Sequence, residues 1–192
     1  NDTESLTAGA AYLYAYCLLC FILSTGYNIG LISRGDIYNT EAGNWKDDYF
    51  LKNRSSFDIW LDLTSTQPIE YAAEKTLSGT YVGELTRIVL YDMIKRGLLF
   101  KGKSSPVFEK PWAFETKYAS EIGKHAQHET EGIRNFLKTI GIYDVSDEDC
   151  SIVWKVADMV TTRAAEVVGV HLAASIDNTD YNSIKLAISL EK

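Results

Sequence analysis

Cysteine is scarce in this sequence, which contains only Cys17, Cys20 and Cys150. Three cysteines exclude a disulfide framework. Cys17 and Cys20 have the C-x-x-C spacing, but no second pair exists to complete a zinc site. If this segment is a strand, residues three apart point to opposite faces. We therefore predict plain buried thiols that behave as small apolar side chains, and reduced thiols fit a cytosolic protein.

Positively charged residues are fewer than negatively charged ones. The chain has 19 Lys and Arg against 26 Asp and Glu, which gives a net charge of −7 and a pI near 5.0. A protein that follows a nucleic-acid backbone needs a basic face, and no cluster of Lys or Arg offers one. We expect no nucleic-acid partner.

No apolar run is long enough to cross a membrane. The longest, from Ala8 to Leu23, includes several tyrosines and falls short of the ~20 apolar residues of a membrane span. No signal peptide is visible, yet the chain does not begin with methionine, so secretion stays open. Asn1-Asp2-Thr3 and Asn53-Arg54-Ser55 also match glycosylation sequons, a pattern that often arises by chance.

The 192 residues that are present, 46% of them hydrophobic, suffice for one domain with its own core. Residues 8–33 are rich in Tyr, Leu, Ile and Phe and predict a hairpin and a following strand. Residues 34–56 are polar and predict a loop. The segment 57–63 is a short amphipathic piece of uncertain type, and Pro68 suits a first helical turn.

Helical periodicity dominates the second half. Apolar residues at three- and four-residue steps predict a helix that ends at Lys95-Arg96-Gly97. We expect a loop over 101–113, a helix over 129–140, and a long helix from the N-cap Ser146 to about Ala174. Alternating residues over 184–190 predict a final strand. This order of elements indicates an α/β layered domain.

Several polar segments lie where a core does not need them. In Ser24-Thr25-Gly26-Tyr27-Asn28 a glycine allows close backbone approach, and Thr25 can offer a hydroxyl and an amide to a phosphate; an ordinary turn explains the segment equally well. By themselves, residues 39–43 read as a loop and Glu74-Lys75 as a solvated helix face. His125, His128 and Glu129 have a spacing that could hold a metal, but nothing else completes such a site, so solvated side chains are the better interpretation.

Taken together, the order of these segments resembles the large (C-terminal) domain of the eukaryotic hexokinase and glucokinase family. The matching blocks are NDT at 1–3, T-G-x-N at 25–28, N-T-E-x-G at 39–43, EKTLSGTYVGELTRIVLYDMIKRGLLF at 74–100, AFETKYAS at 113–120 and TTRAAEVV at 161–168. The resemblance implies a ribonuclease H-like fold of the actin/hexokinase ATPase superfamily, with a mixed sheet and flanking helices.

The resemblance also implies an activity, the ATP- and Mg²⁺-dependent phosphorylation of a hexose (glucose) at its 6-hydroxyl, the first step of glycolysis. Asp2 would be the catalytic base, since a carboxylate can take the hydroxyl proton as the transition state forms. The implied sugar-binding residues are Asn1, Asn28, Glu41 and Glu74. The implied nucleotide-binding residues are Thr25, Gly26, Thr116 and Ser120, while no protein ligand to a metal is implied.

Some parts of the family pattern are absent from the sequence. The first phosphate loop, the small domain and the nucleotide-binding D-G-S motif do not occur in residues 1–192, so we expect an incomplete large domain that is inactive by itself. Pro68-Ile69 stands where the family has Pro-Gly. The segment 14–19 is apolar where the family is polar, which predicts either a self-association or partner surface or burial under a neighbouring segment.

Two functional hypotheses remain open from the sequence. The first is an active hexose kinase of which this chain is a part. The second is a catalytically inactive, sugar-binding or protein-binding relative, which is favoured by Glu4 beside Asp2, by Ser24 in place of glycine and by a shortened segment between Asn28 and Glu41. Glycosylation at Asn1 would block a sugar-binding residue, so we expect a cytoplasmic protein.

Overall fold

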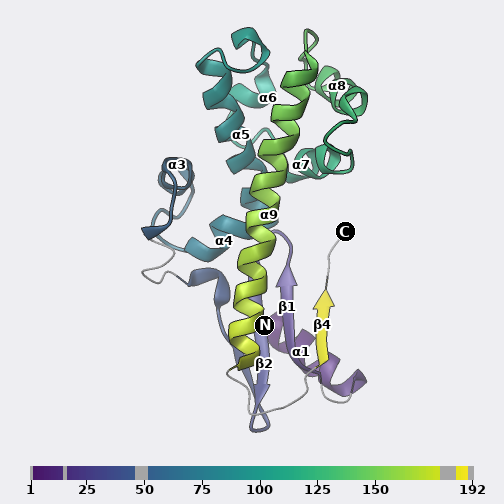
Figure 1. Ribbon diagram of the computed structural model, residues 1–192. Helices are drawn as coiled ribbons and strands as arrows, with labels where there is room; N and C mark the ends of the chain where they lie inside the picture. Colours follow the sequence, from purple (N-terminus) through teal and green to yellow (C-terminus); the bar gives the residue numbers. More distant parts are fainter. Residues whose placement is uncertain (1, 15–16, 46–51, 178–184, 190–192) are drawn as a thin grey trace.

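A computed structural model describes residues 2–14, 17–45, 52–177 and 185–189. A small sheet lies at one end of an elongated molecule, a group of helices lies at the other, and helices α5 and α9 connect the two (Figure 1). The elements are α1 (Asp2–Leu13), β1 (Cys17–Leu23), β2 (Tyr27–Ser33), β3 (Asp36–Asn39), η1 (Ala42–Asn44), α3 (Ser56–Thr64), α4 (Ala72–Leu77), α5 (Gly79–Lys95), η2 (Phe100–Gly102), α6 (Pro106–Glu109), α7 (Thr116–Gly123), α8 (Thr130–Thr139), α9 (Asp147–Asp177) and β4 (Lys185–Ser189).

The first element is a helix, which corrects the prediction of a strand from residue 8. Alanine and other good helix formers are common in this segment, and alanine has the highest helix propensity. Thr3, Thr7 and Ala10 are buried at helical spacing, and the Thr7 hydroxyl donates a hydrogen bond to the Thr3 carbonyl at 2.7 Å. The polar start of the chain is therefore the first turn of a packed helix.

The sheet has the order β3-β2-β1-β4. Strands β1 and β2 form the predicted antiparallel hairpin, and β4 pairs parallel to β1. The C-terminal strand was expected over 184–190, of which the structure describes residues 185–189. Strand β3 lies within a segment that was predicted to be a loop. The prediction missed it because four residues are too few for an alternating pattern to be recognised. The predicted mixed sheet with flanking helices is confirmed.

The two thiols of the C-x-x-C segment lie on one face, not on opposite faces as predicted. Both Cys17 and Cys20 are buried with Leu6 and Ala10 of α1. The pairing of β1 with β4 shifts between Cys17 and Leu19, and such an irregularity reverses the expected alternation. All three cysteines are free and buried, so the prediction of plain buried thiols is confirmed. Burial and the neighbouring Cys17 raise the pKa of the Cys20 thiol to about 11.

The long helices lie where the sequence predicts them. Helix α5 ends at Lys95 and Gly97 follows with a φ of 71°, while α8 ends before Gly141. Helix α9 begins after Ser146, whose hydroxyl accepts a hydrogen bond from the Asp149 amide at 3.1 Å. The ambiguous piece at 57–63 is helix α3.

Two helix boundaries differ from the prediction. Pro68 lies in a turn, and the next helix begins only at Ala72. Residues 106–109 form a short helix within the predicted 101–113 loop, with Pro106 at its first position, where a missing N–H is tolerated.

Two hydrophobic clusters hold the molecule together. The sheet-side cluster lies between β1, β2 and the first half of α5, and it includes Leu19, Ile29 and Ile88. The helix-side cluster lies among the end of α5 and helices α6 to α9, and it includes Phe108 and Ile122. Helix α9 contributes to both clusters.

Within the apolar segment 14–19, the described strand residues are covered and Tyr14 is not. Cys17 and Leu19 are 2% and 0% exposed within β1, so for these two residues the alternative of burial holds. Tyr14 is 59% exposed, and residues 15–16 lie outside the described ranges. No helix in the described part of the chain is both long and apolar enough to cross a membrane.

Candidate active site

A chain of hydrogen-bonded polar side chains lies where β2 begins, beside the first turn of α1. The Asn28 amide nitrogen donates to the Thr3 hydroxyl at 3.1 Å and to the Asn39 side-chain oxygen at 2.6 Å. The Asn39 amide in turn donates to the Glu41 carboxylate at 2.6 Å. The shortened segment between Asn28 and Glu41 therefore brings these two predicted sugar ligands into one network.

Backbone groups fix the orientation of Asn28. Its side-chain oxygen accepts hydrogen bonds from the amides of Ile29 at 2.8 Å and Ala42 at 3.0 Å. Glu41 has a left-handed backbone with a φ of 50°, a conformation that non-glycine residues rarely adopt and that persists where the surrounding structure imposes it. The two predicted ligands are thus held in place before any sugar binds.

Glu74 lies in the first turn of α4, next to the start of β2. Its Oε2 accepts a hydrogen bond from the Tyr27 amide at 3.2 Å. A Cβ on Gly43 would lie 2.7 Å from the Tyr27 carbonyl and 3.0 Å from Glu74 Oε2, so only glycine fits there. Burial raises the pKa of Glu74, and the Tyr27 amide and the Lys75 charge only partly offset this effect.

The residue next to Glu74 differs from expectation. Lys75 is 5% exposed, so it does not belong to a solvated face. Its ammonium donates to the Asp62 carboxylate at 2.5 Å, which ties α4 to α3. Glu74 therefore faces the sheet while Lys75 faces α3.

Asp2 is exposed in the first turn of α1, and its neighbour Thr3 contacts Asn28 directly. Asp2 therefore directly precedes a residue of the polar network in the chain. Glu4 is two residues further along the helix, and side chains two apart on a helix do not face each other. Asn1 lies outside the described residues.

The Thr25-Gly26 turn joins β1 to β2 and is fastened to the start of α5. The Thr25 carbonyl accepts hydrogen bonds from the hydroxyls of Ser78 at 3.0 Å and Thr80 at 2.6 Å. The Gly79 amide donates to the Ser24 carbonyl at 2.6 Å, and a Cβ on Gly79 would lie 2.7 Å from that oxygen. Glycine at 79 therefore permits the contact between turn and helix.

Thr116 connects the same helix start to α7. Its hydroxyl donates to the Gly79 carbonyl at 2.5 Å and accepts from the Gly83 amide at 2.8 Å. The structure thus brings Thr25, Gly26 and Thr116 together around Gly79. Ser120 is exposed one turn further along α7, and it does not line the cavity described next.

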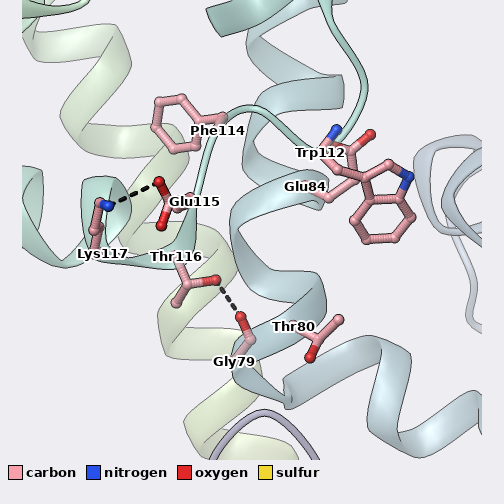
Figure 2. Close-up of a pocket in the computed structure, with 8 residues that line it drawn as sticks. All are labelled: Gly79, Thr80, Glu84, Trp112, Phe114, Glu115, Thr116 and Lys117. Carbon is pink, nitrogen blue, oxygen red and sulfur yellow. Dashed lines mark hydrogen bonds and ion pairs between the residues drawn. The ribbon is translucent and has the colours of Figure 1, made fainter. Parts of the chain in front are cut away.

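A cavity of about 320 Å³ opens beside Thr116, and Figure 2 shows its lining: Gly79, Thr80, Glu84, Trp112, Phe114, Glu115, Thr116 and Lys117. Most of these residues were not singled out from the sequence. Trp112 falls in a segment without periodicity, and Thr80 and Glu84 belong to a helix whose pattern predicts only packing. The proximity of these segments arises from the tertiary fold.

His125 and His128 provide no metal site in the described structure. The His125 Nδ1 lies 3.8 Å from the Glu129 carboxylate, and its ring packs against Gly132. Among the described residues no group of three His, Cys, Asp or Glu side chains could hold a metal ion. The ring of a different histidine, His171, is buried between the Tyr27 hydroxyl, 3.2 Å away, and the Trp45 ring.

Comparisons with known proteins identify relatives of this chain. A family model described as hexokinase matches residues 30–190. Human hexokinase HKDC1 is 34% identical over 91% of this chain and 20% of its own length, and horse hexokinase-2 is 30% identical over 100% of this chain and 22% of its own length. The solved structure of the Schistosoma mansoni hexokinase complexed with glucose has a TM-score of 0.90 and 24% identity, over 98% of this chain and 46% of that one.

The chain therefore belongs to the hexokinase family and has the actin/hexokinase ATPase-like fold. It spans about a fifth of the length of the curated relatives and about half of the solved chain.

Proposed function

We propose that the protein containing this chain transfers the γ-phosphoryl group of ATP to the 6-hydroxyl of a hexose, glucose in the first instance, as the first step of glycolysis. The observation that carries the proposal is the network of Asn28, Asn39 and Glu41, with Glu74 bonded to the neighbouring Tyr27 amide and Thr3, the residue after Asp2, bonded to Asn28. Residues 1–192 would be an incomplete large domain, completed by other parts of the protein.

In this proposal Asp2 accepts the proton of the sugar hydroxyl as it attacks the phosphorus. Proton transfer to a positioned carboxylate typically contributes about 10²–10⁴-fold to a rate. Its exposed position at the start of α1 leaves it open to a substrate. The hydroxyls of the sugar would be held by Asn1, Asn28, Glu41 and Glu74, and directional polar groups of this kind discriminate against analogues that lack a hydroxyl.

The nucleotide would lie along α5. Its phosphates would bind at the Thr25-Gly26 turn, and the remainder would occupy the cavity next to Thr116, with Ser120 at the outer edge. Mg²⁺ would arrive with the phosphates, since in kinases it keeps several waters and is bound by one or two carboxylates and the substrate. The metal would neutralise the charge that develops on the transferred group.

Glucose phosphorylation by the intact protein tests this proposal. We expect Asp2→Asn to lower kcat by about 10²-fold or more while glucose still binds, because the amide keeps the shape of the carboxylate but cannot accept the proton. Asp36→Asn, which alters an exposed carboxylate in β3, should leave kcat unchanged. An intact protein that binds glucose but shows no turnover would instead establish the sugar-binding, catalytically inactive relative.

A further inference from the structure

The wall of the cavity on one side is a tryptophan held in an unusual backbone conformation. Trp112 has a φ of 64° and is 38% exposed. Bulky residues rarely adopt this left-handed conformation, and strain of this kind persists where the surrounding structure imposes it, often at ligand sites. The surroundings of Trp112 must therefore hold its backbone in this conformation.

Two contacts fix the position of the indole. The Trp112 amide donates a hydrogen bond to Glu84 Oε2 at 2.7 Å, and the ring meets Tyr81 in a T-shaped arrangement with centroids 5.8 Å apart. In Figure 2 the indole lies on one side of α5 and the Glu115–Lys117 pair lies on the other. The backbone and the ring of Trp112 thus each have one contact at the cavity, while the residue stays 38% exposed.

The charges around the cavity are balanced in pairs. Both oxygens of Glu84 accept hydrogen bonds from the buried Arg87, at 2.6 and 2.7 Å. Glu115 pairs with Lys117 at 2.8 Å. A lining without net charge suits an uncharged ligand group, and a volume near 320 Å³ lies at the lower end of the range for small-molecule sites.

The orientation of the ligand follows from Thr80. This residue lines the cavity and also donates to the Thr25 carbonyl at 2.6 Å, so the cavity adjoins the turn that would hold the phosphates. The phosphates belong at the Thr25 end, and the flat, uncharged base belongs at the end that carries the indole. We infer that the indole of Trp112 is the stacking surface for the nucleotide base.

This inference rests on the proposed function, and it makes Trp112 a determinant of nucleotide affinity. A stacking surface accepts any base, because every base has a π-face. The loss of binding on removing the indole should therefore be similar for adenine and guanine nucleotides. A residue with only a structural role would not affect nucleotides more than it affects a bare polyphosphate.

The test is a calorimetric titration of the intact protein with ADP, GDP and tripolyphosphate, each with Mg²⁺. Trp112→Leu and Trp112→Phe form a matched pair, since both keep a non-glycine residue at a left-handed φ and only phenylalanine keeps an aromatic face. We expect Trp112→Leu to weaken ADP and GDP binding by about 5- to 100-fold without changing tripolyphosphate binding. Trp112→Phe should stay within about threefold of the wild type.

Trp60→Leu is the control, because Trp60 is 42% exposed on α3 and does not line the cavity. If wild type binds ADP and Trp112→Leu binds it equally well, the stacking role is wrong while the proposed function stands. Equal weakening of ADP and tripolyphosphate would also overturn the stacking role. If the wild type binds neither, the proposed function fails and the inference with it.

Discussion

Ile69 carries a β-branched side chain on a left-handed backbone, with a φ of 73°. Its side chain is 66% exposed, and its amide donates to Asp62 Oδ1 at 2.9 Å. The backbone is therefore held in this conformation by a hydrogen bond, and the side chain adds little burial in return. This is the position where the family has glycine after Pro68.

Replacing Ile69 with glycine should stabilise the protein. The left-handed conformation costs a non-glycine residue roughly 1–2 kcal/mol, and the greater freedom of glycine in the unfolded chain offsets part of that gain. We expect Ile69→Gly to raise the free energy of unfolding in urea by about 1 kcal/mol.

Gly97 offers the reverse substitution as a control. Its φ is 71°, and a Cβ there would meet nothing within 4 Å, so Gly97→Ala reports the backbone effect alone. It should lower the free energy of unfolding by about 1 kcal/mol. A loss of stability in Ile69→Gly, with Gly97→Ala as expected, would mean that side-chain contacts outweigh backbone strain at residue 69.

At the scale of elements, helix α3 is attached to its neighbours through ion pairs of its two buried aspartates. The guanidinium of Arg163 donates to both oxygens of Asp58, at 2.8 and 3.0 Å. Asp62 accepts from Lys75 at 2.5 Å and from Arg54 at 3.0 Å. Desolvation alone would raise the pKa of both aspartates, but these hydrogen bonds outweigh it and hold the pKa below its usual value.

These shifts predict how acid affects the attachment of α3. A depressed folded-state pKa means that the carboxylates stabilise the fold above the unfolded value of about 3.9, and that this stabilisation is lost as the pH falls below it. Lys75→Met should lower the free energy of unfolding by about 3 kcal/mol at pH 7, because Asp62 is left as a buried charge without its closest partner. The difference from the wild type should be smaller at pH 3.5, because Asp62 without Lys75 takes up a proton more readily and is then no longer an unpaired buried charge.

Lys101→Met is the matched control, since Lys101 is 73% exposed and pairs with Asp144 on the surface. Exposed pairs contribute about 0–1 kcal/mol, so this change should be nearly neutral at both pH values in urea titrations. If Lys75→Met were as mild as Lys101→Met, the buried pair would not hold α3 in place.

The elements that the sequence predicts well are those with long periodic patterns. Helices α5 and α9 have many turns over which apolar positions repeat, and their ends have glycine or a serine cap. Helix α1 was misread because tyrosines and leucines near the start of β1 conceal its alanine-rich pattern. The strand irregularity after Cys17 has no local signature, so the shared burial of the two thiols could not be foreseen.

The site shows a similar division. The resemblance to a family led to Asn28, Glu41, Glu74, Thr25 and Thr116, and the structure brings them into two adjoining groups. The contacts of Asn39 with Asn28 and of Trp112 with Glu84 join segments that are distant in the sequence. Residue types and spacing alone do not show which distant segments pack together.

At the scale of the whole molecule, the described chain does not enclose the proposed sugar-binding residues: Asn28 is half-buried and Glu41 is exposed. Asn28, Asn39 and Glu41 are joined by hydrogen bonds. No further part of the described chain covers Glu41, so water can reach it. Closure around a substrate excludes water and completes such sites in many enzymes. We therefore expect the isolated chain to bind glucose weakly, with a Kd of about 1 mM or more, and to show no phosphorylation.

Calorimetric titration of the isolated chain with glucose checks this expectation, with the intact protein measured beside it. Tight binding by the isolated chain would contradict the need for further protein contacts to the sugar. The melting temperature of the chain, measured in parallel, shows that weak binding does not reflect an unfolded sample.

Helix α9 has 31 residues and is therefore roughly 46 Å long. Val153 and Ala157 on its first half belong to the helix-side cluster, and Val160, Ala164 and Val168 belong to the sheet-side cluster. A single unbroken helix is thus a wall of both clusters, and a cut through it removes part of each. We therefore expect an exchange of segments between relatives to be tolerated only if the α9 residues of both clusters stay matched to their neighbours.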